Sequence, residues 1–340
     1  MACFIEFLPM KNNHAGNKAR LDINDICRNI KLKCTETLYE EMFFSVIDKI
    51  KYILSPGKIY KILLIMKKRS GITLLQYPFY FNPFMKYALG NYVKNNKTVL
   101  LLHDVDSLRA LGKNKIGDEI CLLNRACAII VHNKKMKEKL THLGVHIPMV
   151  ELEIFDYLLD ELPTKKQMEA DVAFAGNLAK SIFLNEINKA GIRVNLYGPG
   201  YNENMEGKNV SYKGSYSPDQ VPYVLDAKFG LIWDGDSLLT CSGNTGEYLK
   251  YNNPHKLSLY MASGLPVIVW KKSAIAEFVL SNNVGIAVDS IFEIKDNINK
   301  ITDEQYADMR KKVSIIQKRV CNGYYTKKVI EKAILIANGV

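Results

Sequence analysis

Short apolar segments alternate with amphipathic segments along most of the chain. In the first half, apolar runs of strand length predict β-strands at 2–8, 71–76, 97–103 and 126–132. Amphipathic patterns predict helices near 18–30, 44–54, 83–94, 115–124 and 134–142. Apolar strands that alternate with helices indicate a parallel sheet that helices cover on both faces.

The alternation stops between residues 153 and 169 and then begins again. This stretch, EIFDYLLDELPTKKQME, is first acidic and then basic and has no strand period, so we interpret it as a linker. The strands predicted after it are 170–176, 192–198, 209–214, 227–235, 265–270 and 284–288. The helices predicted among and after them are 180–190, 217–225, 253–263, 274–281, 291–298, 302–319 and 324–337.

This pattern predicts an α/β protein of two doubly wound, Rossmann-type domains. We place the first domain at 1–152 and the second at 170–320, with a C-terminal helix in 321–340 that can cross back to the first domain. Ligands of such sheets bind at the carboxyl ends of the strands. Two facing domains are therefore expected to share a central cleft.

Composition favours a reducing compartment. The seven cysteines form no C-x-x-C pair, which argues against a disulfide framework or a zinc site. The start of the chain lacks the pattern of a secretory signal, and no apolar run reaches the roughly 18 residues that span a bilayer. We therefore expect a cytoplasmic protein, at most peripheral to the inner face of the membrane.

The net charge of +11 suits nucleic acid, an anionic membrane or a phosphate-bearing substrate. No arginine-rich arm, zinc finger or aromatic RNA motif is present, so we do not expect a nucleic-acid partner. The segment 42–70 is apolar with interleaved lysines. It is interpreted either as helices packed on the first sheet or at a subunit contact, or as an interfacial pair of helices on a membrane. His142 and His146 are four apart but lack further ligands, so no metal site is expected.

Polar residues follow two strands of the first half. After 2–8 comes MKNNHAGNKARLDI, in which Gly16 permits a close backbone approach and the next helix offers free N–H groups to an anion or a sugar hydroxyl. His103 ends the predicted strand 97–103, and Asp104 and Asp106 follow it. An imidazole or carboxylate there can accept a proton from a substrate hydroxyl. The alternative is that Asp106 caps a helix and Asp104 orients the loop.

The second half places cations at helix starts. Asn177 follows the strand 170–176 in a glycine turn, and Lys180 lies in the first turn of the next helix, where a cation is unfavourable without an anion. Tyr216, in the loop after 209–214, offers an aromatic face that suits a flat base. Asn252 or Asn253 caps the helix that carries Lys256 in its first turn. Two lysines and two helix N-termini around one point suit a diphosphate.

The segment PHKLSLYMASGLPVIVWKKSAIAEFV resembles the donor-binding segment of GT-B glycosyltransferases. Together with FAGNLAKS, YGPG, YKGSYSPDQVP, FGLIWDG and GEYLKYNNPHK, it is most similar to the bacterial second-step glucosyltransferases that act on O-GlcNAc of serine-rich adhesins, and to the related galactofuranosyltransferases. NNHAGNKAR resembles the N-terminal loop of the same group, and the resemblance is strongest over 171–288.

The resemblance implies a GT-B fold and the transfer of a hexose, with glucose as first choice, from a UDP-sugar bound by the second domain to a glycan or glycoprotein acceptor. Lys180 and Lys256 would hold the diphosphate, and Asn252 and Asn253 would assist. The nucleotide base of the UDP-sugar would lie near Tyr216 and Tyr223. Many relatives bind ribose with a glutamate where this chain has Leu259, which leaves Glu277 as a candidate.

Positive charge at the diphosphate stabilises leaving UDP without a metal, so no cofactor is expected. His14, Asp104 and Asp106 are the candidates for a catalytic base. A homo-oligomer is also expected. The alternatives are galactofuranosyl or other sugar transfer in surface polysaccharide synthesis, and a non-catalytic subunit that binds a nucleotide sugar.

Overall fold

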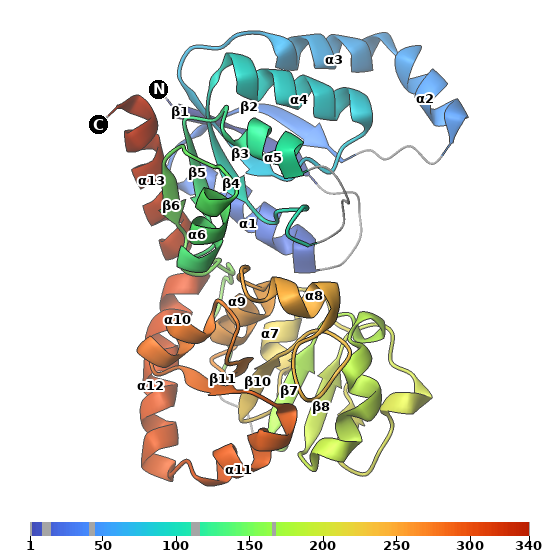
Figure 1. The fold of residues 1–340 in the computed structure, drawn as a ribbon, viewed down its shortest axis with the longest axis vertical. Coiled ribbons are helices and arrows are strands. Elements are labelled where there is room, and N and C mark those ends of the chain that lie inside the picture. Colours follow the sequence, from blue (N-terminus) through green and yellow to red (C-terminus); the bar gives the residue numbers. More distant parts are fainter. Residues whose placement is uncertain (1, 9–14, 41–44, 110–115, 165–167, 340) are drawn as a thin grey trace.

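A computed structural model describes residues 2–8, 15–40, 45–109, 116–164 and 168–339. The described residues form two six-stranded sheets with the orders β2-β1-β3-β4-β5-β6 and β12-β11-β10-β7-β8-β9. All their strand pairings are parallel. Figure 1 shows the sheets in separate halves of the molecule, with helices on both faces of each.

The first half contains the strands β1 (Ala2–Leu8), β2 (Lys33–Tyr39), β3 (Ile72–Tyr77), β4 (Lys97–Leu102), β5 (Ala128–Val131) and β6 (Met149–Glu151). Its helices are α1 (Ala15–Asn29), α2 (Val46–Ile53), α3 (Pro56–Met66), α4 (Pro83–Asn95), α5 (Ile116–Leu123) and α6 (Lys134–His142). The strands β2 and β6 were not predicted from the sequence. β2 is a largely exposed edge strand in which polar residues interrupt the apolar ones. β6 has only three residues.

The second half contains the strands β7 (Val172–Ala175), β8 (Val194–Tyr197), β9 (Val210–Tyr212), β10 (Phe229–Ile232), β11 (Val267–Trp270) and β12 (Gly285–Val288). Its helices are α7 (Val221–Val224), α8 (Gly243–Tyr248), α9 (His255–Ala262), α10 (Ala276–Ser281), α11 (Ile294–Asn299), α12 (Asp303–Cys321) and α13 (Tyr324–Asn338). Helix α8 was not predicted from the sequence. The segment 182–190, expected as an α-helix, forms a 3₁₀ helix.

The last helix, α13, packs on the first sheet although it follows α12 of the second half, and it contacts β3, β4, β5 and β6 (Figure 1). The turn between α12 and α13 needs Gly323, which has a φ of +72° and would place a Cβ only 2.7 Å from Ile26 of α1. The chain therefore joins its two halves twice, through the segment after β6 and through α13.

The start of α13 is capped by a buried carboxylate in the segment after β6. Asp156 accepts hydrogen bonds from the backbone N–H groups of Thr326, at 2.6 Å, and Tyr325, at 3.3 Å. Burial is the main cause that raises the pKa of Asp156 to about 7. The carboxyl group therefore supports the fold as an acceptor, while its ionisation opposes burial.

We expect Asp156→Ala to lower the free energy of unfolding by about 1–2 kcal/mol, as the loss of a helix cap does. Asp156→Asn keeps an acceptor oxygen and should lose less. Because the folded pKa of Asp156 is raised above 3.8, the stability of the wild type should fall as the pH rises from about 4 through 7. The asparagine variant should lack this component, and urea unfolding at several pH values would measure it. Equal pH dependence in both proteins would contradict the assignment.

Candidate active site in the interdomain cleft

A cavity of about 230 Å³ lies between the two halves, at the carboxyl ends of strands from both sheets. The first half lines it with Asp104 and Arg109. The second half lines it with Asn177, Lys180, Ser181, Asp234, Thr245, Tyr248, Asn252 and Lys256. Five of the residues proposed from the sequence thus meet at one cavity: Asp104, Asn177, Lys180, Asn252 and Lys256.

Lys256 extends from the first turn of α9 over the end of β7. Its Nζ lies 3.1 Å from Oδ1 of Asp234, which follows β10, and 4.4 Å from the ring centroid of Phe174 in β7. A Cβ at Gly176 would come within 3.2 Å of the Lys256 side chain, so the glycine leaves the path of the lysine open. The ammonium group is only partly exposed and faces the cavity. An anionic ligand would share it with Asp234.

Lys180 provides a second positive charge at the same cavity. Oδ1 of Asn177 accepts a hydrogen bond from the backbone N–H of Lys180, at 3.2 Å, and caps the short 3₁₀ helix Leu178–Lys180. The Lys180 side chain is exposed, and within the described ranges it forms no ion pair. It is therefore available to an anion, whereas Asn177 holds the backbone that presents it.

Asn252 contributes an unsatisfied polar atom. Its Oδ1 is buried at the cavity and has no hydrogen-bond partner among the described residues. Buried acceptors are normally paired, so this atom suits a donor group on a ligand. His255 at the start of α9 is different: burial lowers its pKa to about 3, so the ring is neutral and adds no charge for a phosphate.

Asp104 faces these lysines from the first half. Its Oδ2 lies 2.8 Å from Nη1 of Arg109, and the Tyr80 hydroxyl donates to the same oxygen at 3.5 Å. Burial raises the pKa of Asp104 to about 6, although Arg109 opposes the shift. A carboxylate with this pKa, next to a cavity, can take a proton from a substrate hydroxyl near neutral pH.

Tyr248, at the end of α8, links Asp104 to the second half. Its hydroxyl accepts a hydrogen bond from the backbone N–H of Val105, at 2.9 Å. It also forms a hydrogen bond to Asp104 that lowers the pKa of the carboxyl group. Arg109 lies 5.8 Å from the centroid of the Tyr248 ring. The position of the candidate base therefore depends on a tyrosine of the other domain.

Tyr248→Phe should lower turnover about tenfold or more, because a hydrogen bond to a charged group contributes roughly 1.5–3 kcal/mol. Since this bond lowers the pKa of Asp104, its loss should move the acid limb of the pH–rate profile to higher pH. Tyr251→Phe in the following loop is the matched control. An unshifted profile in Tyr248→Phe would show that the hydroxyl does not act on Asp104.

Among the described residues, several others proposed from the sequence do not line the cavity. His14 lies outside the described residues, and Gly16 lies in the first turn of α1. Asp106 is partly buried, and its backbone N–H donates to Glu119 at 3.1 Å. Burial and the nearby Glu119 raise the pKa of Asp106. Of the two candidate bases that the structure describes, Asp104 is the one that lines the cavity.

Asn253 is buried and fully engaged within the protein. Its Nδ2 donates to the carbonyls of His132, at 2.7 Å, and Glu153, at 2.9 Å, while its Oδ1 accepts from Asn133 at 2.7 Å. No atom of this amide remains for a ligand. We therefore revise the prediction for Asn253: it joins the two halves of the chain rather than contacting a substrate.

The aromatic and acidic candidates lie elsewhere. Tyr216 is 41% exposed in the loop after β9, and its hydroxyl donates to the carbonyl of Lys213 at 3.0 Å. Tyr223 lies in α7, before β10, and its hydroxyl donates to the carbonyl of Glu161 at 2.7 Å. Glu277 is exposed on α10. Tyr223 is thus at the wrong edge of the sheet for a ligand of the cleft.

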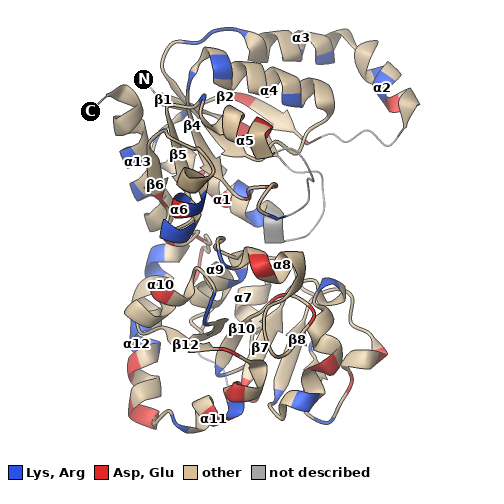
Figure 2. Ribbon diagram, viewed as in Figure 1, with Lys and Arg blue, Asp and Glu red and all other residues tan. Residues whose placement is uncertain are grey.

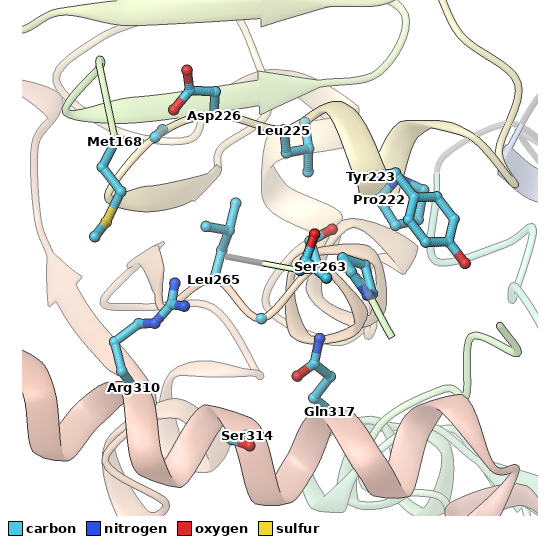
Figure 3. A pocket seen from close by; sticks show the side chains of 14 residues that line it. Met168, Pro222, Tyr223, Leu225, Asp226, Ser263, Leu265, Arg310, Ser314 and Gln317 are labelled. Atoms are coloured by element: carbon cyan, nitrogen blue, oxygen red, sulfur yellow. The ribbon is translucent and has the colours of Figure 1, made fainter. Parts of the chain in front are cut away.

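Tyr223 instead borders a separate pocket of about 200 Å³, which Figure 3 shows. Arg310 and Gln317 of α12 also line this pocket, and Leu265 lines it just before β11. It therefore lies at the amino ends of the strands. Doubly wound sheets bind their ligands at the opposite edge, so we assign the active site to the cleft.

Five lining residues were not proposed from the sequence: Arg109, Ser181, Asp234, Thr245 and Tyr248. Arg109 closes the stretch LLHDVDSLR, and Tyr248 belongs to GEYLKYNNPHK, so both lay within segments already considered. Within the described residues, no group of three or more His, Cys, Asp or Glu side chains could hold a metal ion. The expectation of metal-independent chemistry remains a prediction.

Solved structures with the same fold include glycosyltransferases. The α-glucosyltransferase in complex with UDP and a 13-mer DNA is 12% identical and has a TM-score of 0.61, with 99% of each chain covered. The T4 phage BGT in complex with UDP-glucose is 12% identical with a TM-score of 0.56, and the match covers 98% of this chain and 99% of the other. This confirms the expected GT-B fold of two facing α/β domains.

Two facing parallel-sheet domains with a cationic cleft between them have the GT-B architecture. The chain belongs to the Glucosyltransferase 3-like family: the model of the N-terminal domain matches residues 3–154 and that of the C-terminal domain matches 172–333. This confirms the family resemblance and the enzyme class that the sequence predicted.

Curated relatives include a β-1,6-galactofuranosyltransferase, WbbI of Escherichia coli (strain K12), which is 36% identical over 244 residues, 70% of this chain and 71% of the relative. Glucosyltransferase 3 of Streptococcus gordonii is 28% identical over 242 residues, with 70% and 71% covered. Across the described ranges, no helix combines the length and apolar character needed to cross a membrane.

Proposed function

We propose that the protein transfers a hexose from a UDP-sugar to a hydroxyl group of a sugar acceptor, with glucose as the first candidate. The observation that carries this proposal is the meeting of Lys180 and Lys256 of the second domain with Asp104 of the first at one cavity. Structural neighbours in complex with UDP or UDP-glucose support the donor class.

The two domains divide the chemistry between them. Lys180 and Lys256 bind the diphosphate and stabilise the negative charge that develops on UDP as the glycosidic bond breaks. Asp104 accepts the proton of the attacking hydroxyl group. Arg109 and Tyr248 hold the Asp104 carboxylate toward the cleft. Oδ1 of Asn252, which has no hydrogen-bond partner among the described residues, accepts a hydrogen bond from the UDP-sugar. None of these steps requires a metal, so transfer should persist in EDTA.

Galactofuranosyl transfer is the second candidate. The specific observation in its favour is the higher identity to the galactofuranosyltransferase, 36% against 28% for the glucosyltransferase. The acceptor is proposed to be a glycan or glycoprotein, with GlcNAc on a serine-rich adhesin as one choice and a surface polysaccharide as the other. The homo-oligomer expected from the sequence also stays a prediction.

A panel of nucleotide sugars tests the proposal. Thermal shift with UDP-glucose, UDP-galactose, UDP-GlcNAc and UDP-galactofuranose would identify the donor. UDP release would then be measured with that donor, with and without a GlcNAc-bearing peptide or a galactose-containing glycan. If a UDP-sugar stabilises the protein but none of the acceptors tested increases the release of UDP, the non-catalytic binding subunit would be favoured. Stabilisation by none of the UDP-sugars would contradict the proposed donor class.

A further inference from the structure

The hairpin of α2 and α3 leaves many apolar side chains exposed on the first domain. In α2, the exposed apolar residues are Val46, Ile47, Ile50 and Ile53, with Leu54 directly after the helix. Leu54 is 73% exposed and Val46 is 68% exposed. In α3, Tyr60 and Leu63 are exposed in the same way. Figure 1 shows α2 projecting at the edge of the molecule, away from the cleft.

The apolar residues of α2 share one face. At about 100° per residue, the five positions from Val46 to Leu54 cover an arc of roughly 120°. Lys49 and Lys51 lie about 40° beyond its two edges. Tyr52 lies opposite this face and is buried, with its ring stacked on that of Phe84 in α4 at 6.0 Å. The packed side of α2 is thus away from the apolar face, which remains uncovered by the described residues.

Charge identifies the kind of surface that this face fits. Residues 45–70 contain seven basic side chains and one acidic side chain. The acid, Asp48, is used in the cap of α2, where it accepts from the backbone N–H of Ser45 at 2.9 Å. Figure 2 shows the basic residues on both helices. Lysines at the edges of an apolar helix face can extend to anionic head groups while the apolar side chains enter the acyl boundary.

A second copy of the chain fits this surface less well. A twofold contact places the same patch on both sides, so the lysines of one copy would face the lysines of the other. We infer that the hairpin of α2 and α3 docks the enzyme on an anionic lipid surface, with the apolar face of α2 in the interface and Lys49 and Lys51 at the head groups. This goes beyond the proposed transfer reaction, because the hairpin lies outside the cleft.

Co-sedimentation with vesicles tests the inference. The full chain should bind vesicles made of equal parts phosphatidylcholine and phosphatidylglycerol, and should bind phosphatidylcholine vesicles far more weakly. A combined Ile47→Ser, Ile50→Ser and Leu54→Ser variant should lose about tenfold or more in partitioning. Lys49→Gln with Lys51→Gln should lose about 25-fold, since each lysine near an anionic surface contributes about fivefold.

Matched controls alter similar residues elsewhere. The exposed Leu239, Ile315 and Leu335 can be changed together to serine, and the exposed Lys311 and Lys312 to glutamine. Both controls should bind vesicles as the wild type does. Failure of the wild type to bind the anionic vesicles would overturn the inference, and so would binding by the serine variant of α2 equal to that of the wild type.

The competing occupant is decided in solution. Sedimentation velocity without lipid should give the same species for the wild type and the serine variant of α2. If that variant breaks an oligomer into smaller species, the face is a contact between copies and the membrane inference is overturned. Transfer to a soluble acceptor should match the wild type in all these variants, so a failure of docking is distinguishable from a failure of the proposed reaction.

Discussion

Asp104→Asn should lower turnover by about 10²–10⁴-fold while the affinity for UDP stays within about twofold, because a positioned base acts on the transferred proton and not on the bound nucleotide. The amide keeps the shape of the carboxylate and its place beside Arg109 and Tyr248. A transfer assay and isothermal titration with UDP on the same preparation measure the two quantities.

The pH dependence of turnover in the wild type is a second test of the role of Asp104. Asp104 must be ionised to accept a proton, and its pKa is raised to about 6. Turnover should therefore rise with pH up to about 6 and then level off. Asp106→Asn is the matched control, since Asp106 does not line the cavity, and it should lose far less activity. Loss of UDP affinity together with turnover in Asp104→Asn would place this residue in the nucleotide site instead.

Lys256→Ala should weaken UDP binding about tenfold or more, because a charge-assisted hydrogen bond contributes roughly 1.5–3 kcal/mol. The substitution also leaves Asp234 without its partner at 3.1 Å, so an uncompensated carboxylate would then face the diphosphate. Both effects act in the same direction. Isothermal titration with UDP measures the change.

An exposed lysine far from the cleft serves as the control for this substitution. Lys311→Ala on α12 removes the same charge from the surface and should leave UDP affinity unchanged. If Lys256→Ala binds UDP with the affinity of the wild type, the assignment of Lys256 to the diphosphate is wrong. Addition of EDTA should change neither protein, because the cationic side chains supply the charge that a metal would otherwise provide.

Local signals were sufficient for the parts of the site that depend on one element. Lys180 and Lys256 were proposed because each was predicted to lie in the first turn of a helical segment, and the structure places both at the cavity. The buried strands were predicted because each is a short, continuous apolar run. β2 was missed because an edge strand with polar residues lacks the apolar run that marks a buried strand.

Features that depend on contacts between the domains could not be read from local patterns. Asn253 has the composition of a ligand-binding residue, but its amide is consumed by His132, Glu153 and Asn133 of the other half. Nothing in the local sequence distinguishes Tyr248 from other aromatic residues. In the folded chain its hydroxyl accepts a hydrogen bond from Val105, in the loop that carries Asp104. The sequence contains these residues, whereas their partners lie 100 or more positions away.

A crystal structure of the protein with UDP bound tests the central claim most directly. The claim is that the cleft between the domains binds the nucleotide diphosphate. The diphosphate should lie within hydrogen-bonding distance of Nζ of Lys180 and Nζ of Lys256, with Asp104 facing the same cavity from the first domain. A nucleotide bound instead in the pocket beside Arg310 and Gln317, at the amino ends of the strands, would contradict the account.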